Sequence, residues 1–135
     1  MRLDQTDKAL QCLMESLEIY KVLQYDIMVS QTYSNLAYLN LYIGNYANAL
    51  DYVNQSLAFM EEKGVKEGLI YTLTTKSEIC LKQGKYQEAL INSKSAFDIA
   101  QARGTLSEIA FSSQLLMESY EASGKYKEAL EIEKL

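Results

Sequence analysis

The residues that most often carry enzyme chemistry are absent from this chain or are not grouped for it. The sequence contains no histidine, which removes the commonest general base and the commonest zinc ligand. Serine, threonine and carboxylate side chains are frequent, but no sequence pattern pairs a nucleophile with an activating base. We therefore predict no enzymatic activity, with no catalytic residue, no metal site and no cofactor.

Two Gly-Lys dipeptides, Gly84-Lys85 and Gly124-Lys125, come closest to a phosphate-binding loop. Such a loop also needs a glycine upstream, a serine or threonine after the lysine, and a preceding strand. Tyrosine follows each lysine instead. An internal repeat explains both dipeptides better than a nucleotide site does.

Charge and hydropathy restrict the partners and the compartment. The chain has 13 Lys and Arg against 18 Asp and Glu, a net charge of −5, which argues against nucleic acid. Its longest apolar run, 36–43, is interrupted by Asn40 and is too short to insert into a membrane, and no signal-peptide pattern is visible. Two isolated cysteines, Cys12 and Cys80, are predicted to be buried apolar groups in a reducing compartment. We expect a cytoplasmic protein.

Glycines at a spacing of 20 residues mark the expected helix ends along the chain. Five of the six glycines follow this spacing: Gly44, Gly64, Gly84, Gly104 and Gly124. Glycine is common just past a helix end, and the segments between these glycines carry apolar residues at helical spacing. The pattern predicts an all-α chain of antiparallel helix pairs with a 40-residue repeat.

This repeat divides the chain into a single domain, 1–135, made of a partial repeat 1–24, repeats 25–64 and 65–104, and a partial repeat 105–135. Continued backwards, the spacing reaches Gln24 and Asp4, which places a broken repeat at the start, with its helix end at Gln24. We interpret the chain as a piece of a longer array. Its end faces are then expected to expose Leu10, Leu13, Leu17 and Leu130, which would allow a homodimer or end-to-end association.

The repeated motif has three copies: Leu36-Ala37…Gly44-x-Tyr46-x-x-Ala49-Leu50…Ser56-Leu57, Ser77…Cys80…Gly84-x-Tyr86-x-x-Ala89-Leu90…Ala96-Phe97, and Leu116-Met117…Tyr120…Gly124-x-Tyr126-x-x-Ala129-Leu130. This motif resembles the tetratricopeptide repeat. The resemblance implies an α-α superhelix, a right-handed solenoid of antiparallel helix pairs. The repeat is longer than the usual length of about 34 residues and lacks the common terminal proline. It is similar to an extended subclass that occurs in bacterial sensor kinases, cyclases and peptide-sensing regulators, and in some eukaryotic adaptors.

The resemblance implies a concave groove that is lined by the first helix of each repeat and binds an extended or helical peptide. The candidate groove residues are Gln31, Asn35, Tyr38, Tyr42, Tyr71, Thr74, Thr75, Glu78, Lys82, Phe111, Gln114, Glu118 and Glu121. In this family an asparagine at the Asn35 position often bonds the peptide backbone, and an amide can both donate and accept.

The charges of these residues favour a neutral or basic partner segment, because Lys82 is their only cation. Family members that bind chaperone tails hold a carboxylate with several basic residues, which are missing here. The resulting hypothesis is a non-enzymatic protein-binding module, the sensory or docking part of a regulatory protein. Two alternatives stay open: Tyr38, Tyr42 and Tyr71 could pack between helices, and the chain could be a spacer or oligomerisation element.

Overall fold

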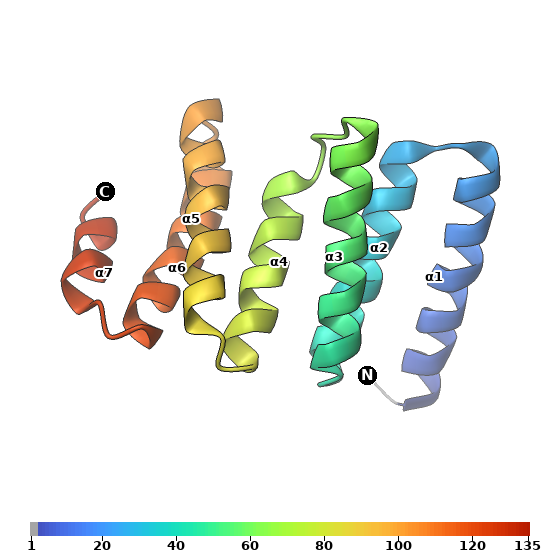
Figure 1. Ribbon diagram of the computed structural model, residues 1–135, viewed down its shortest axis with the longest axis horizontal. Coiled ribbons are helices and arrows are strands. Elements are labelled where there is room, and N and C mark those ends of the chain that lie inside the picture. Colours follow the sequence, from blue (N-terminus) through green and yellow to red (C-terminus); the bar gives the residue numbers. More distant parts are fainter. Residues whose placement is uncertain (1–2) are drawn as a thin grey trace. The chain divides into compact units, whose positions relative to one another are not determined.

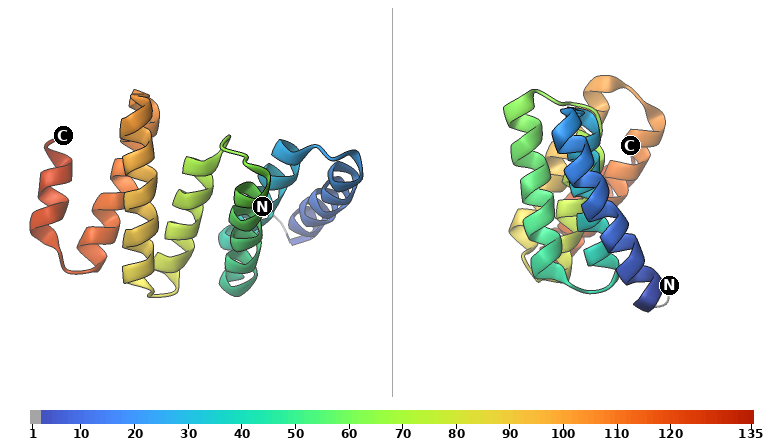
Figure 2. Two further views of the ribbon diagram at one scale, coloured as in Figure 1. Left: turned by 45° about the horizontal axis from the view of Figure 1, so that its top comes forward. Right: turned by 90° about the vertical axis from the view of Figure 1, so that its right-hand side faces the viewer.

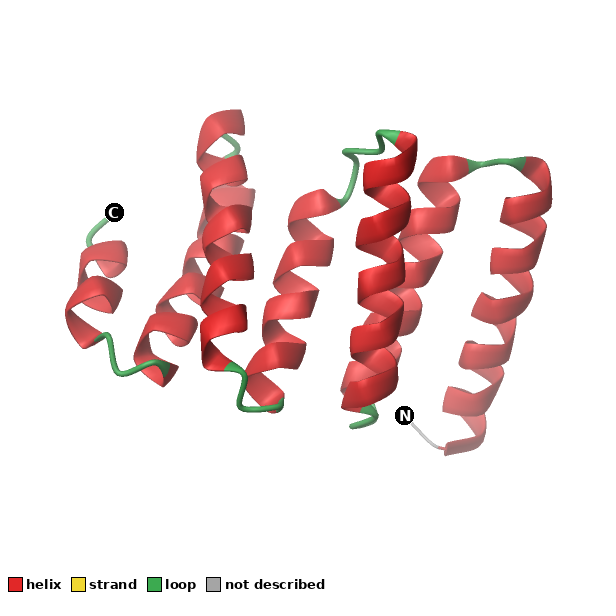
Figure 3. Cartoon of the chain, viewed as in Figure 1, coloured by secondary structure: helices red, strands yellow, loops and turns green. Residues whose placement is uncertain are grey.

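The computed structural model describes residues 3–135, and every element in this range is a helix (Figures 1 and 3). The seven helices are α1 (Leu3–Leu23), α2 (Asp26–Tyr42), α3 (Tyr46–Lys63), α4 (Leu69–Lys82), α5 (Tyr86–Arg103), α6 (Leu106–Ala122) and α7 (Tyr126–Glu133). The chain divides into two compact units, 1–69 and 70–135. Each unit is described by itself.

The turns at Gly44, Gly84 and Gly124 have one geometry. Each glycine has a positive φ, of 86°, 75° and 76°. The next residue donates its backbone N–H to a carbonyl five residues back, as Asn45 does to Asn40 over 2.8 Å. This arrangement is a Schellman motif, which satisfies the free carbonyls at the helix end and reverses the chain.

Gln24 occupies the same kind of turn at the end of α1. Its φ of 58° is the only positive value at a non-glycine among the described residues. The N–H of Tyr25 donates to the carbonyl of Tyr20 over 3.0 Å, so the hydrogen bonding is that of the glycine turns. The helix end predicted at Gln24 is therefore confirmed.

The connection between α3 and α4 departs from the 20-residue spacing. Gly64 ends α3 as expected, with φ 68°. A second glycine with positive φ, Gly68, adds a turn before α4 begins at Leu69. As a result α4 has only 14 residues, whereas α2 and α6 have 17 each.

In the first unit, α2 packs against both α1 and α3, and Figure 1 shows α3 returning beside α2. The buried core comprises Leu17, Val29, Tyr33 and Leu36. Two buried hydroxyls join α2 to α3, because Ser34 Oγ and Ser56 Oγ lie 2.8 Å apart and Ser56 also donates to the Ser30 carbonyl over 2.9 Å. Small residues at this contact let the two helices approach closely.

The second unit has two buried clusters around α5. Ile70 packs with Ala96 and Ala100, and Leu90 and Phe97 pack with Leu116. Ser77 in α4 donates its hydroxyl to the Ala89 carbonyl in α5 over 2.6 Å. Figure 2 shows α7 beside α6, and Ile132 of α7 packs against the Leu116 cluster.

The expected exposure of four residues of α1 needs correction. Cys12 is exposed, while Cys80 is buried as predicted. Leu17 is buried, and Leu10 and Leu13 are partly buried, because this stripe of α1 packs onto α2. The exposed apolar side chains of α1 are Met14, Ile19, Val22 and Leu23 instead. At the other end Leu130 is exposed as expected.

Candidate functional site

The first unit presents four of the predicted residues on α2. Gln31, Asn35, Tyr38 and Tyr42 are all exposed, as their i, i+4, i+7, i+11 spacing requires for one helix face. Tyr38 and Tyr42 retain 48% and 62% of their surface exposed, so packing does not bury these rings. Two aromatic rings and two amides thus lie on a solvent-accessible strip of α2.

The two threonines of α4 that were predicted to line the groove are buried instead. Thr74 and Thr75 are 1% and 3% exposed, and each hydroxyl donates to the Tyr71 carbonyl over 2.9 Å. A threonine can be buried in this way because its hydroxyl is satisfied within its own helix. Their side chains are not accessible to a partner, whereas the Tyr71 ring is 38% exposed.

The second unit brings predicted residues from two helices to one small pocket. Glu78 of α4 and three residues of α6, Phe111, Gln114 and Glu118, line a cavity of about 80 Å³. The fifth lining residue, Leu115, is buried and forms part of its wall. Sequence reasoning missed Leu115; it lies 80 residues after Asn35, so the repeat itself could have marked it.

The pocket has a negative electrostatic character. Burial raises the pKa of the Glu78 carboxyl, the nearby Glu118 carboxylate raises it further, and Lys82 one turn along α4 lowers it. The Gln114 amide donates to Glu118 Oε1 over 3.0 Å, which orients that carboxylate. Lys82 and Glu121 are exposed beyond the pocket lining. The arrangement suits a partner group that is positively charged or donates hydrogen bonds.

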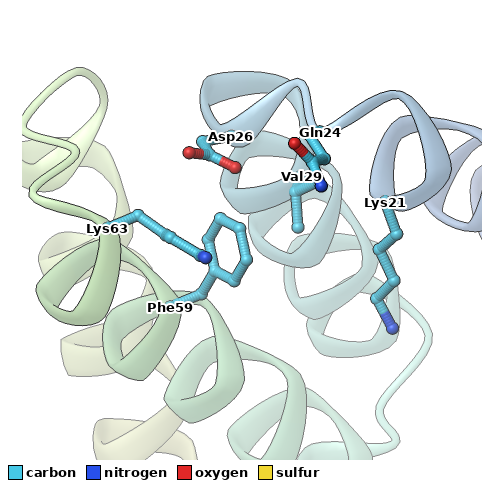
Figure 4. Close-up of a pocket in the computed structure, with 6 residues that line it drawn as sticks. All are labelled: Lys21, Gln24, Asp26, Val29, Phe59 and Lys63. Carbon is cyan, nitrogen blue, oxygen red and sulfur yellow. The ribbon is translucent and has the colours of Figure 1, made fainter.

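A second pocket, which the sequence did not predict, lies in the first unit (Figure 4). It has a volume of about 320 Å³ and is lined by Lys21, Gln24, Asp26, Val29, Phe59 and Lys63. Lys63 Nζ lies 6.0 Å from the centre of the Phe59 ring, and Lys21 Nζ lies 5.4 Å from that of Tyr33. Among the residues lining this pocket, the sequence singled out only Gln24, which stands at a position where the other repeats have glycine.

The described part of the chain offers no arrangement for metal binding. Across residues 3–135, no group of three or more His, Cys, Asp or Glu side chains could hold a metal ion. Within the same range, no helix has the length and hydropathy needed to cross a membrane.

Comparison with known proteins gives a family match and likenesses to solved structures. A family model for the tetratricopeptide repeat matches residues 1–62. The crystal structure of TPR-like repeats from a Podosopora anserina protein, described as a kinesin light chain, superposes with a TM-score of 0.73 at 20% sequence identity. The likeness covers 97% of this chain and 65% of that chain. No curated protein matches the chain.

These comparisons bear on the fold and on the family relationship. The structural likeness confirms the predicted all-α fold of repeated helix pairs, while the handedness of the superhelix stays a prediction. The family match supports a relationship to the tetratricopeptide repeat over residues 1–62. The assignment to an extended 40-residue subclass stays a prediction.

Proposed function

We propose that this chain is a protein-binding module that holds a peptide or protein segment on the exposed faces of its first helices. Each unit is proposed to offer its own contact surface, the α2 strip in the first unit and the α4–α6 pocket in the second. We place the module in the sensory or docking part of a cytoplasmic regulatory protein. The family match and the absence of catalytic groupings in the sequence support this function.

The observation that carries the proposal is the α4–α6 pocket. Glu78, Phe111, Gln114 and Glu118 are candidate groove residues by the family resemblance, and these four side chains line one cavity. An exposed ring beside carboxylates and an amide offers apolar area and hydrogen bonding together, which is typical of peptide-binding surfaces.

The charge of this surface favours a neutral or basic segment as the partner. Its candidate residues in the second unit include three carboxylates, Glu78, Glu118 and Glu121, and one cation, Lys82. Electrostatic complementarity would speed association with a basic segment and would disfavour an acidic one.

The alternative is a spacer or oligomerisation element. Its support is the exposed apolar surface outside the proposed site: Val22 in α1 is 81% exposed, and Leu130 in α7 is 56% exposed. Contact through such residues would produce a homodimer or end-to-end association.

Selection from a displayed library of random peptides distinguishes the two functions. We expect binders whose affinity falls at least tenfold on Tyr42→Ala or Phe111→Ala substitution, since exposed aromatic anchors commonly dominate such contacts. Matched controls are Tyr126→Ala and Ile91→Ala, which remove side chains of similar exposure, 66% and 58%, outside the site. All four variants should keep wild-type helicity and melting temperature.

Failure to select any binder, or equal loss in the control variants, would favour the spacer. Sedimentation over a wide concentration range completes the comparison. Self-association that Val22→Ser or Leu130→Ser abolishes would support oligomerisation as the function.

A further inference from the structure

We infer that the α4–α6 pocket takes one positively charged side chain, lysine or arginine, of the segment bound by this module. The inference rests on the proposed function and specifies the chemistry of one subsite within it. Three features of the pocket carry it: its shape, its carboxylates and its aromatic wall.

The pocket has room for the end of a basic side chain. Its volume of about 80 Å³ exceeds the roughly 15 Å³ that a single water molecule needs. Glu78 enters from α4 and Glu118 from α6, so the two carboxylates border the cavity from different helices. Leu115 closes one wall and keeps the site apolar between them.

The carboxylates of this pocket, Glu78 and Glu118, form no ion pair in the described part of the chain, and Lys82 acts on Glu78 only at longer range. The carboxylates repel each other, and Glu118 contributes to the raised pKa of Glu78. A bound ammonium or guanidinium group would relieve this repulsion and would replace the water lost from the half-buried Glu78.

Phe111 adds a second preference for a cation. Phe111 is 51% exposed and lines the pocket. It shares one face of α6 with Gln114 and Glu118. An aromatic face attracts a cation within about 6 Å, and its apolar surface also covers the aliphatic stem of a lysine or arginine. A neutral apolar side chain would gain only the second contribution.

A titration with short peptides tests the subsite without knowledge of the partner. The probes are acetyl-Gly-Gly-Xaa-Gly-Gly-amide peptides in which Xaa is lysine, arginine, norleucine or glutamate, added to the ¹⁵N-labelled full chain. We expect the lysine and arginine peptides to shift the amide signals of Phe111, Gln114 and Glu118 saturably. Their dissociation constants should be at least tenfold below that of the norleucine peptide, and the glutamate peptide should be weakest.

The variants separate charge recognition from general stickiness. Glu78→Gln with Glu118→Gln keeps the side-chain shapes and should weaken lysine binding at least tenfold. Glu128→Gln with Glu131→Gln removes two exposed carboxylates of α7 and should leave binding unchanged. Equal binding of lysine and norleucine, or unchanged lysine binding in the pocket variant, would overturn the inference.

This outcome is distinct from failure of the proposed function. Library-selected segments could bind through Phe111 and still tolerate replacement of their basic residues. That result would support the protein-binding module and contradict the cation subsite. If no library segment binds at all, the proposed function falls, whatever the short peptides do.

Discussion

The hydroxyl oxygens of Ser34 in α2 and Ser56 in α3 lie 2.8 Å apart, and both residues are buried. Ser56 donates to the Ser30 carbonyl over 2.9 Å, and its hydroxyl also lies within hydrogen-bond distance of the Ser34 hydroxyl. The contact satisfies polar groups where the two backbones come close. A buried hydroxyl pair is therefore part of the joint between these helices.

Replacing Ser56 with alanine should lower the free energy of unfolding by about 1 kcal/mol, because the hydrogen bonds to Ser30 and Ser34 are lost. Urea unfolding followed by circular dichroism measures the change. Ser113→Ala is the control, since that hydroxyl bonds only locally, to the Ala110 carbonyl, and a change within about 0.5 kcal/mol is expected. Equal losses in the two variants would show that the inter-helix contact contributes nothing specific.

The turn at Gln24 predicts an unusual stabilising substitution. A left-handed conformation costs a non-glycine residue about 1–2 kcal/mol, whereas glycine adopts it freely at some entropic cost in the unfolded chain. Gln24→Gly should therefore raise the free energy of unfolding by about 0.5–1 kcal/mol, and Gly84→Ala should lower it by about 1 kcal/mol. Gln24→Ala should be close to neutral, because alanine keeps the strain. A Gln24→Gly variant no more stable than Gln24→Ala would contradict this account.

The glycines predicted the fold well because a turn geometry is local. Gly44, Gly84 and Gly124 need only their own helix end to form the same turn, and Gln24 follows even without glycine. Side-chain exposure is not local. Thr75 lies 40 residues after Asn35, yet Thr75 is buried and Asn35 is exposed. The repeat position alone could not distinguish the two residues, because the packing of neighbouring helices determines which side chains of a helix are buried.

The pocket residues were predictable for a related reason. Phe111 and Glu118 lie two turns apart on one face of α6 and are exposed, and Glu78 is a charged residue of α4, so their character agrees with a solvent-facing position. Cys12 misled the prediction because a lone cysteine is usually buried, while the exposed side of α1 also carries Met14 and Ile19. Where apolar residues do not form one clear stripe on a helix, as in α1, residue type predicts burial poorly.

The two cysteines should differ strongly in reactivity. Cys12 is exposed, whereas Cys80 is fully buried, and burial raises the pKa of its thiol, with the nearby Glu88 carboxylate raising it further. Thiolate is the reactive form, so iodoacetamide at neutral pH should label Cys12 at least a hundredfold faster. Mass spectrometry of the labelled peptides gives both rates. In denaturant the rates should converge, and rapid labelling of Cys80 in the native Cys12→Ser variant would show that its surroundings open readily.

Glu78 should make stability depend on pH in a defined direction. Because burial and then Glu118 raise the pKa of its carboxyl above the usual 4.5, the folded chain holds this proton at pH values where the unfolded chain has lost it. The contribution of Glu78 to the free energy of unfolding is therefore greatest below 4.5 and falls as pH rises through the raised pKa. Glu78→Gln cannot lose a proton, so the variant should gain stability relative to the wild type over this window and keep that gain at neutral pH.

Chemical unfolding of both proteins at a series of pH values from about 4 to 8 measures this difference. The control is Glu61→Gln, which removes an exposed carboxylate of α3 and should follow the wild-type curve. In a Glu118→Gln background the gain from Glu78→Gln should shrink, because one of the two causes of the raised pKa is gone. A Glu78→Gln curve parallel to the wild type at every pH would mean that the pocket does not raise the pKa of this carboxyl. Such a result would also remove the electrostatic basis for a cation in the pocket, since an unperturbed carboxylate gains little from a positively charged side chain in water.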